Sequence, residues 1–253
     1  MRTPRRWEIS FPRDLVLDQD EEWCEVRIGG RNIRVRFHDY HVIYECPGLY
    51  EQLFDDVLEC VSPRVVRGLL ARAVADRGIA PADLRVLDVG AGNGMVGAEI
   101  RALGAGTVVG VDIIEEAARA AARDRPGVYD DYLVADLTAL TPEQREELTA
   151  RRFNAMTTVA ALGFGDIPPA AFTTAFSLVE PSGLIAFTIK EDFVTDHDVT
   201  GFSRLIKQML AEEVITVIAE EHYRHRLSVR GDPLYYVAYV ARKLRDVPAD
   251  RTG

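Results

Sequence analysis

Residues 86–94 read Val86-Leu-Asp-Val-Gly-Ala-Gly-Asn-Gly94, and this stretch decides the fold. The apolar run from residue 85 to Val89 predicts a buried β-strand. Glycine then recurs at every second position, which allows a tight turn and the close approach of a ligand where a Cβ would collide. Apolar residues recur at helical spacing from Met95 onward, so the turn opens a helix whose free N–H groups face the site. This order predicts a nucleotide-type pocket at the carboxyl end of a parallel strand.

The residues within the turn favour one kind of ligand over others. The dinucleotide fingerprint G-x-G-x-x-G/A needs a small residue at position 95, where this chain has Met95. A phosphate-binding loop needs Gly-Lys followed by Ser or Thr, and this tripeptide does not occur in the sequence. Asp88 would repel a pyrophosphate, but its charge suits a ligand that carries an ammonium or sulfonium group. A dehydrogenase is therefore the weaker alternative.

The pattern Asp-x-Gly-x-Gly-x-Gly over residues 88–94 resembles motif I of the class I S-adenosylmethionine (SAM) dependent methyltransferases. The resemblance covers roughly residues 50–245 and implies that SAM is the cofactor and S-adenosylhomocysteine (SAH) the product. The family usually has Asp where this chain has Asn154, at a position that is often structural. In the turn, the residues expected to bind SAM are Asp88, Gly90, Ala91, Gly92, Asn93 and Gly94.

Two further acidic residues follow the next two predicted strands. The strand over residues 107–113 ends near Asp112, at the distance from the glycine turn where a doubly wound fold places a carboxylate for both ribose hydroxyls. The strand over residues 131–137 ends near Asp136, which the resemblance implies as the partner of the adenine amino group. Three acids after three successive strands indicate one binding site. Ile113 and Leu137, which follow two of these acids, and Ala160 are also expected to bind the cofactor.

The remaining pattern predicts an α/β fold, a Rossmann-like, doubly wound sheet of seven mostly parallel strands. Further strands are predicted over residues 153–162 and 184–189, and helices over 142–152, 170–179 and 203–213. Strands over residues 214–219 and 234–240 have only a loop between them, so they pair antiparallel or lie apart, and the resemblance implies a C-terminal antiparallel hairpin. We expect the methyltransferase domain to span residues 61–245, followed by a frayed tail over 246–253.

Residues 1–60 form a separate N-terminal hairpin and lid segment in this interpretation. Alternating apolar residues flank Gly29-Gly30, a dipeptide that is typical of a two-residue β-hairpin turn. The segment that follows contains Tyr40, Tyr44 and Tyr50. The resemblance implies a tyrosine-containing lid over SAM, and Tyr44 is the lid residue expected to bind the cofactor. Ordinary half-buried aromatic residues are the alternative, and the hairpin is also a candidate surface for a homodimer.

Composition narrows the classes of partner. The chain has 253 residues and a net charge of −10, which disfavours broad contact with nucleic acid or an anionic membrane. The sequence contains no apolar run of about 18 residues, so no membrane span is expected. Three scattered cysteines indicate reduced thiols in a cytoplasmic protein. Clustered Cys and His spacing is lacking in the sequence, so no metal site is expected.

Methyl transfer from a sulfonium mainly requires positioning, and a hydroxyl acceptor also benefits from a general base, for which His is the usual choice. The candidate catalytic residues are His38, His41 and His197, with Glu191 and Asp192 as further candidate bases. A charged segment near the C-terminus offers a site for an acidic substrate group or, as the alternative, a solvated hairpin loop. Its residues are His222, Arg224, His225, Arg226 and Arg230.

These patterns predict a SAM-dependent methyltransferase that acts on O or N, and less readily on C, of a small molecule such as a secondary metabolite. A nucleic-acid or protein methyltransferase is one alternative. Amino-directed DNA enzymes carry Asn/Asp-Pro-Pro-aromatic after the fourth strand, and residues 161–169 depart from that motif. A SAM-binding protein without catalysis, which acts as a scaffold, is another alternative.

Overall fold

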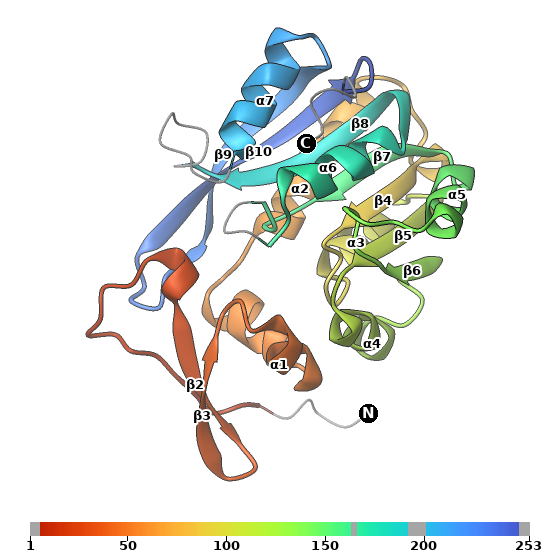
Figure 1. The fold of residues 1–253 in the computed structure, drawn as a ribbon. Helices are drawn as coiled ribbons and strands as arrows, with labels where there is room; N and C mark the ends of the chain where they lie inside the picture. The colour runs from red at the N-terminus through yellow and green to blue at the C-terminus, as the bar shows by residue number, and fades with distance from the viewer. Residues whose placement is uncertain (1–5, 163–165, 192–200, 248–253) are drawn as a thin grey trace.

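The structure is a computed structural model that describes residues 6–162, 166–191 and 201–247. A seven-stranded sheet in the order β6-β5-β4-β7-β8-β10-β9 forms its centre (Figure 1). The first five strands are parallel, and β10 pairs antiparallel with both β8 and β9, which confirms the predicted Rossmann-like fold. The strands of this sheet are β4 (Arg85–Val89), β5 (Thr107–Asp112), β6 (Asp131–Val134), β7 (Phe153–Thr158), β8 (Val179–Lys190), β9 (Ile215–Leu227) and β10 (Pro233–Lys243).

Strand β4 lies at the centre of the parallel part, between β5 and β7. Every residue of β4 after Arg85 is buried, as expected for a strand that is covered on both faces. Asn154 joins the start of β4 to β7, because its Oδ1 accepts the Arg85 N–H at 2.8 Å and its Nδ2 donates to the Asp83 carbonyl. The residue that departs from the family pattern therefore has a structural role here.

Helices cover both faces of the sheet. On one face, α2 (Ser62–Ala75) and α3 (Met95–Leu103) pack onto the strands and build a core around Leu69, Leu70 and Ile100. On the other face lie α5 (Pro142–Ala150), α6 (Pro169–Ser177) and α7 (Phe202–Ala211), with a core of aromatic side chains. Helix α4 (Glu115–Asp124) runs beside β5 and β6. A capping box between Thr141 and Gln144 begins α5.

The antiparallel edge differs from the sequence prediction in length. Strand β9 continues through residues 221–226, which the sequence analysis assigned to a charged hairpin loop. The prediction of a loop was wrong because alternate residues of this segment pack against β10 and the N-terminal part, and tertiary burial outweighs the high local charge. Strands β6 and β7 are shorter than predicted and end at Val134 and Thr158, so Asp136 and Ala160 lie in the loops that leave the sheet.

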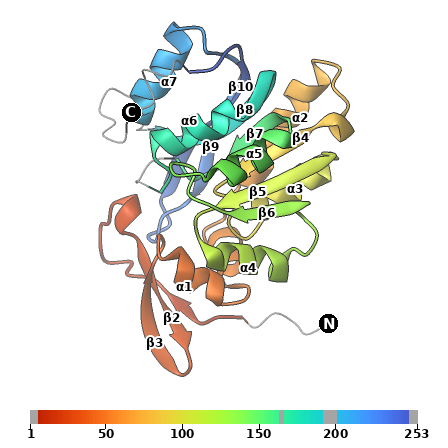
Figure 2. The same ribbon diagram turned by 45° about the vertical axis from the view of Figure 1, so that its right-hand side comes forward.

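The N-terminal segment forms a second sheet, in the order β1-β2-β3, from β1 (Ile9–Ser10), β2 (Trp23–Ile28) and β3 (Arg31–Arg36). The Gly29-Gly30 turn joins β2 and β3 as predicted, and β1 is an additional strand. A short 3-10 turn, η1 (Gln19–Glu21), precedes β2. Helix α1 (Tyr40–Glu45) and the π-helix η2 (Glu51–Val57) follow, and α1 lies against α4 in both views (Figures 1 and 2).

None of the helices in the described ranges is long and apolar enough to cross a membrane.

Candidate functional site

The glycine turn after β4 takes the left-handed conformation that its sequence predicts. Gly90, Gly92 and Gly94 have φ angles of +68°, +53° and +87°, where side chains with a Cβ are strained. A Cβ at Gly92 would lie 2.5 Å from the Tyr44 hydroxyl, and one at Gly90 would lie 3.0 Å from Ile167. Gly90 and Gly92 must therefore lack a Cβ so that the lid and the opposite loop can approach the turn.

Asp88 lies beneath this turn and is almost fully buried. Its carboxylate accepts hydrogen bonds from the Thr157 hydroxyl and the Tyr129 hydroxyl, each at 2.7 Å. Burial raises the pKa of Asp88 to about 6, although both hydrogen bonds act in the opposite direction. The structure thus places Asp88 as a support behind the turn and not among the residues that line the cavity in front of it.

Two tyrosines that the sequence analysis did not select hold the turn from the same side. The Tyr129 hydroxyl bonds to Asp88, and the Tyr132 hydroxyl donates to the Gly92 carbonyl at 2.8 Å. The ring of Tyr129 occupies the space beside Gly97, and the ring of Tyr132 occupies the space beside Gly110. Gly97 and Gly110 were the signal for these tyrosines in the sequence, because a glycine inside a helix or strand marks the close approach of another group.

Asp112 and Asp136 both line a cavity at the carboxyl ends of the strands. Asp112 accepts the backbone N–H of Gly92 at 2.9 Å and that of Ile114 at 3.0 Å, and burial raises its pKa. Asp136 is exposed, and hydrogen bonds from the hydroxyl and backbone N–H of Thr138 lower its pKa. Hydrogen bonds within the protein therefore orient both acids before a ligand enters.

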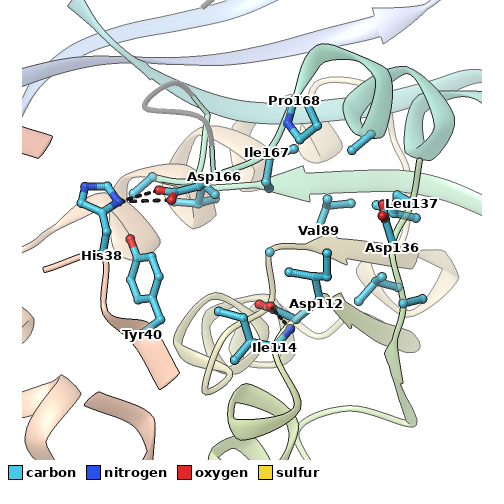
Figure 3. A pocket seen from close by; sticks show the side chains of 18 of the residues that line it. His38, Tyr40, Val89, Asp112, Ile114, Asp136, Leu137, Asp166, Ile167 and Pro168 are labelled. Carbon is cyan, nitrogen blue, oxygen red and sulfur yellow. Dashed lines mark hydrogen bonds and ion pairs between the residues drawn. The ribbon is translucent and has the colours of Figure 1, made fainter. Parts of the chain in front are cut away.

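This cavity has a volume of about 390 Å³, within the range of small-molecule sites. Figure 3 shows Asp112 and Asp136 on one side, with His38, Tyr40 and Asp166 on the other. Ala160, in the left-handed conformation with φ +54°, closes the end of β7, and its N–H donates to the Thr188 hydroxyl. Predicted site residues on the wall are Gly90, Asp112, Ile113, Asp136, Leu137, Ala160, Tyr40, Tyr44 and Tyr50. Ala91, Gly92 and Asn93 line a smaller cavity next to Tyr44.

The lid over this cavity is held by polar contacts to the catalytic fold. The Glu51 carboxylate accepts from Asn93 Nδ2 and from Arg125 Nη1, both at 2.7 Å. Arg123 donates to the backbone carbonyl of Tyr44 at 3.0 Å. These contacts connect the π-helix and α1 to the glycine turn and to α4, and Tyr40, Tyr44 and Tyr50 line the same cavity as Asp112 and Asp136.

The three candidate histidines occupy different positions. His38 lies on the cavity wall, and its Nδ1 is 2.9 Å from Asp166 Oδ2. A carboxylate can only accept, so Nδ1 carries the proton in this pair. His41 is exposed on α1 and does not line the cavity, and His197 lies outside the described residues. Glu191 forms an ion pair with His222 at 3.1 Å, and Asp192 also lies outside the described residues.

The charged segment of β9 does not form an open anion site. Arg226 is buried and paired with Glu22 at 2.6 Å, while Arg224 pairs with Glu59. His225 is buried, and both burial and the neighbouring Arg226 hold its pKa well below the usual range. Arg230 lies 3.7 Å from Asp232. The predicted binding of an acidic group by this set is not supported, because the guanidinium groups already face carboxylates.

The comparisons with known proteins agree with this geometry. Residues 61–231 match the model of a family described as a methyltransferase domain. The chain belongs to this family. Membership confirms the resemblance to the SAM-dependent methyltransferases, and SAM is the cofactor of such proteins. No curated protein sequence matches the chain.

Solved structures of methyltransferases share the fold at low sequence identity. Magnesium protoporphyrin IX methyltransferase from Synechocystis PCC 6803, solved with bound SAM, is 17% identical, with a TM-score of 0.50 over 72% of this chain and 79% of its own. A putative RNA methyltransferase from Pyrococcus horikoshii is 16% identical, with a TM-score of 0.50 over 72% of this chain and 85% of its own. A SAM-dependent methyltransferase from Methanosarcina mazei is 16% identical, with a TM-score of 0.50 over 68% of this chain and 98% of its own.

The donor set of the cavity fits SAM. Glycines at positions 90 and 92 let another group approach the backbone of the turn closely, and carboxylates at Asp112 and Asp136 are acceptors that suit hydroxyl and amino donors. In the described ranges, no group of three or more His, Cys, Asp or Glu side chains has the geometry of a metal site.

Proposed function

We propose that this methyltransferase acts on an O or N atom of a small molecule, with the His38–Asp166 pair as the base for a hydroxyl acceptor. SAM, when bound, supplies a methyl group on a positively charged sulfur. In this proposal Gly90 and Gly92 let the cofactor approach the turn, Asp112 receives the ribose hydroxyls and Asp136 the adenine amino group. Asp88 acts from behind, because its bonds to Tyr129 and Thr157 keep the turn in place.

The single observation that carries the proposal is the position of the His38–Asp166 pair. Both residues line the cofactor cavity and also a narrower cavity behind it. Asp166 accepts Nδ1–H and so leaves Nε2 as the nitrogen that takes the proton from an acceptor hydroxyl. Asp166 also stabilises the imidazolium that results. An amine acceptor needs to be neutral, and the same pair then receives its proton after the transfer.

The residues that line the cavity support a small acceptor. Residues of the N-terminal part, among them His38, Tyr40 and Tyr50, wall the cavity on the side opposite the cofactor residues. Their rings suit contact with a small organic molecule, and the volume of about 390 Å³ lies within the range of small-molecule sites. The net charge of −10 also disfavours a polyanionic acceptor.

The experiment that tests the proposal measures SAH release from SAM with a panel of phenols, amines and carboxylic acids of similar size. We expect turnover with at least one hydroxyl or amino compound. His38→Gln should lower kcat by about 100-fold or more for a hydroxyl acceptor, since it removes the base, with little change in SAM affinity. His41→Gln is the matched control on the same segment and should retain kcat. Lack of turnover with every compound of the panel, or equal effects of the two variants, would contradict the proposal.

Three further predictions remain part of this proposal. A division near residue 60 separates the N-terminal sheet and lid from the catalytic fold, and the start of the family match at residue 61 supports it. A homodimer through the N-terminal hairpin is supported by the exposed side chain of Ile33. A cytoplasmic location is supported by three free cysteines, two of which are buried.

A further inference from the structure

A second cavity of about 50 Å³ lies behind the His38–Asp166 pair. It shares His38, Tyr40, Tyr50 and Asp166 with the cofactor cavity, so the two spaces adjoin at the proposed base. The volume exceeds that of a single water site and suits one polar substituent or the edge of an aromatic ring. Its wall also includes Gln19, Phe37, Phe54, Cys60, Ala160, Ala161, His225, Arg226 and Tyr236.

The positive charge on this wall is already neutralised. The side chains of Arg226 and Glu22 are 5% and 2% exposed and form an ion pair at 2.6 Å. Arg226 also donates to the Leu227 carbonyl, and its guanidinium lies 5.4 Å from the centre of the Phe37 ring. His225 Nδ1 is bonded to the Ser62 hydroxyl, and its lowered pKa keeps the ring neutral at neutral pH. A carboxylate that entered here would lose its hydration without gaining an unpaired cation.

Gln19 is the polar group of this wall that lacks a complete set of partners. Its Nε2 donates to the Tyr236 hydroxyl at 2.7 Å. Its Oε1 is buried and has no hydrogen-bond partner among the described residues. A buried acceptor without a partner costs about 1–3 kcal/mol, which a ligand group can recover. A hydroxyl group suits this amide in either orientation, because it both donates and accepts.

The remaining wall is aromatic. The rings of Phe37 and Phe54 meet edge to face with centroids 5.5 Å apart, and those of Tyr50 and Phe54 lie 4.7 Å apart. Tyr50 lines both this cavity and the cofactor cavity, so aromatic surface extends from one cavity into the other. A flat ring would find favourable edge and face contacts along this surface.

We propose that the acceptor of this enzyme is a neutral aromatic compound with two hydroxyl groups. One hydroxyl lies at the His38–Asp166 pair and receives the methyl group, while its proton passes to His38 and the bond from sulfur to the methyl carbon breaks. The second hydroxyl binds the Gln19 carboxamide in the cavity behind. Gln19 is thus the residue that determines acceptor specificity. This inference rests on the proposed small-molecule methyl transfer and adds the class of acceptor.

The test compares four acceptors of similar size: 1,4-dihydroxybenzene, phenol, 4-hydroxybenzoate and tyramine. We expect kcat/KM for 1,4-dihydroxybenzene to exceed that for 4-hydroxybenzoate and for tyramine by about tenfold or more, because a buried charge would remain unpaired. Gln19→Leu should lower kcat/KM for 1,4-dihydroxybenzene by about tenfold and leave that for phenol unchanged, since phenol has no second hydroxyl. Gln208→Leu, on α7 and remote from both cavities, is the matched control.

Tyr236→Phe provides a second variant, which removes the hydroxyl that holds Gln19 and keeps the ring. It should reduce the preference for 1,4-dihydroxybenzene over phenol in the same direction as Gln19→Leu, with unchanged SAH affinity. Methylation of 4-hydroxybenzoate or tyramine as fast as that of 1,4-dihydroxybenzene, or a preference that Gln19→Leu does not change, would overturn the inference and leave the proposed function intact. Failure of every small acceptor would instead overturn the proposed function and the inference with it.

Discussion

At the scale of single residues, Asp88 shows how a motif acid can act without touching the cavity. Its side chain is 1% exposed, and the hydroxyls of Thr157 and Tyr129 satisfy its oxygens. These bonds stabilise the ionised form, yet burial has the larger effect and raises its pKa to about 6. The acid of the motif therefore maintains the shape of the turn at some cost in folding free energy.

This balance predicts a pH dependence of stability. The pKa of Asp88 rises from 3.8 in the unfolded chain to about 6 in the folded one. Its contribution to the free energy of unfolding is therefore present below about pH 4 and is lost as the pH rises through 6. Asp88→Asn removes the titration and keeps the shape. Between pH 4 and pH 8, the wild type should therefore lose at most about 3 kcal/mol of unfolding free energy relative to the variant.

Thermal unfolding of both proteins across that pH range measures the difference, and residues that titrate elsewhere cancel in the comparison. Asp83→Asn is a suitable control, because Asp83 is exposed and outside the cavities. A difference between Asp88→Asn and wild type that does not vary with pH would contradict the assignment.

At the scale of elements, the lid depends on one carboxylate. Glu51, in the π-helix, receives hydrogen bonds from both Asn93 and Arg125, and Asn93 is 1% exposed. Helix α1 adds its own contacts to α4 next to this site. The position of the lid is thus coupled to the glycine turn through a small number of polar contacts.

Glu51→Ala should lower the free energy of unfolding by about 1–3 kcal/mol, because it leaves the amide of Asn93 without its acceptor. It should also weaken SAH binding and increase hydrogen exchange in residues 40–57. Glu45→Ala is the control, since Glu45 is exposed on α1 and lies 3.7 Å from Arg119. Calorimetry and exchange mass spectrometry provide the two measurements. Similar effects of the two substitutions would show that Glu51 does not hold the lid.

The elements also show how far sequence reasoning extends. The strand, turn and helix from Arg85 to Leu103 were predicted from hydrophobic period and glycine position, and the structure has them at those residues. The extension of β9 through Arg226 was missed, because its polar residues face partners from the N-terminal segment that are distant in sequence. Local pattern predicts an element best where burial alternates with the period of that element.

At the scale of the whole molecule, the buried pair of Glu22 and Arg226 joins the N-terminal sheet to the edge of the large sheet. Glu22 also accepts the Val229 N–H at 2.7 Å, so the charge is bonded on more than one side. A buried charge that loses its partner is strongly destabilising, whereas loss of both charges is tolerated better. The pair therefore sets how the two sheets meet, whatever its net contribution to stability.

Glu22→Leu and Arg226→Met should each lower the unfolding free energy by about 3–5 kcal/mol, and the double variant should lose much less than their sum. Urea unfolding measures the double-mutant cycle. The exposed pair of Glu8 and Arg27, with atoms 3.6 Å apart, is the matched control and should show coupling below about 1 kcal/mol. Additive losses at Glu22 and Arg226 would contradict the role of the pair.

By itself, the sequence determined the methyltransferase fold and the acids that follow its first three parallel strands, because strand period, glycine turns and acid spacing are local properties. Only the tertiary structure brought His38 to Asp166, 128 residues apart, and Gln19 to Tyr236, 217 residues apart. A single such bond contributes about 1 kcal/mol, far less than the packing that directs the chain, so no local pattern specifies the partners. The acceptor side of the site therefore emerges from the way the N-terminal segment packs onto the sheet.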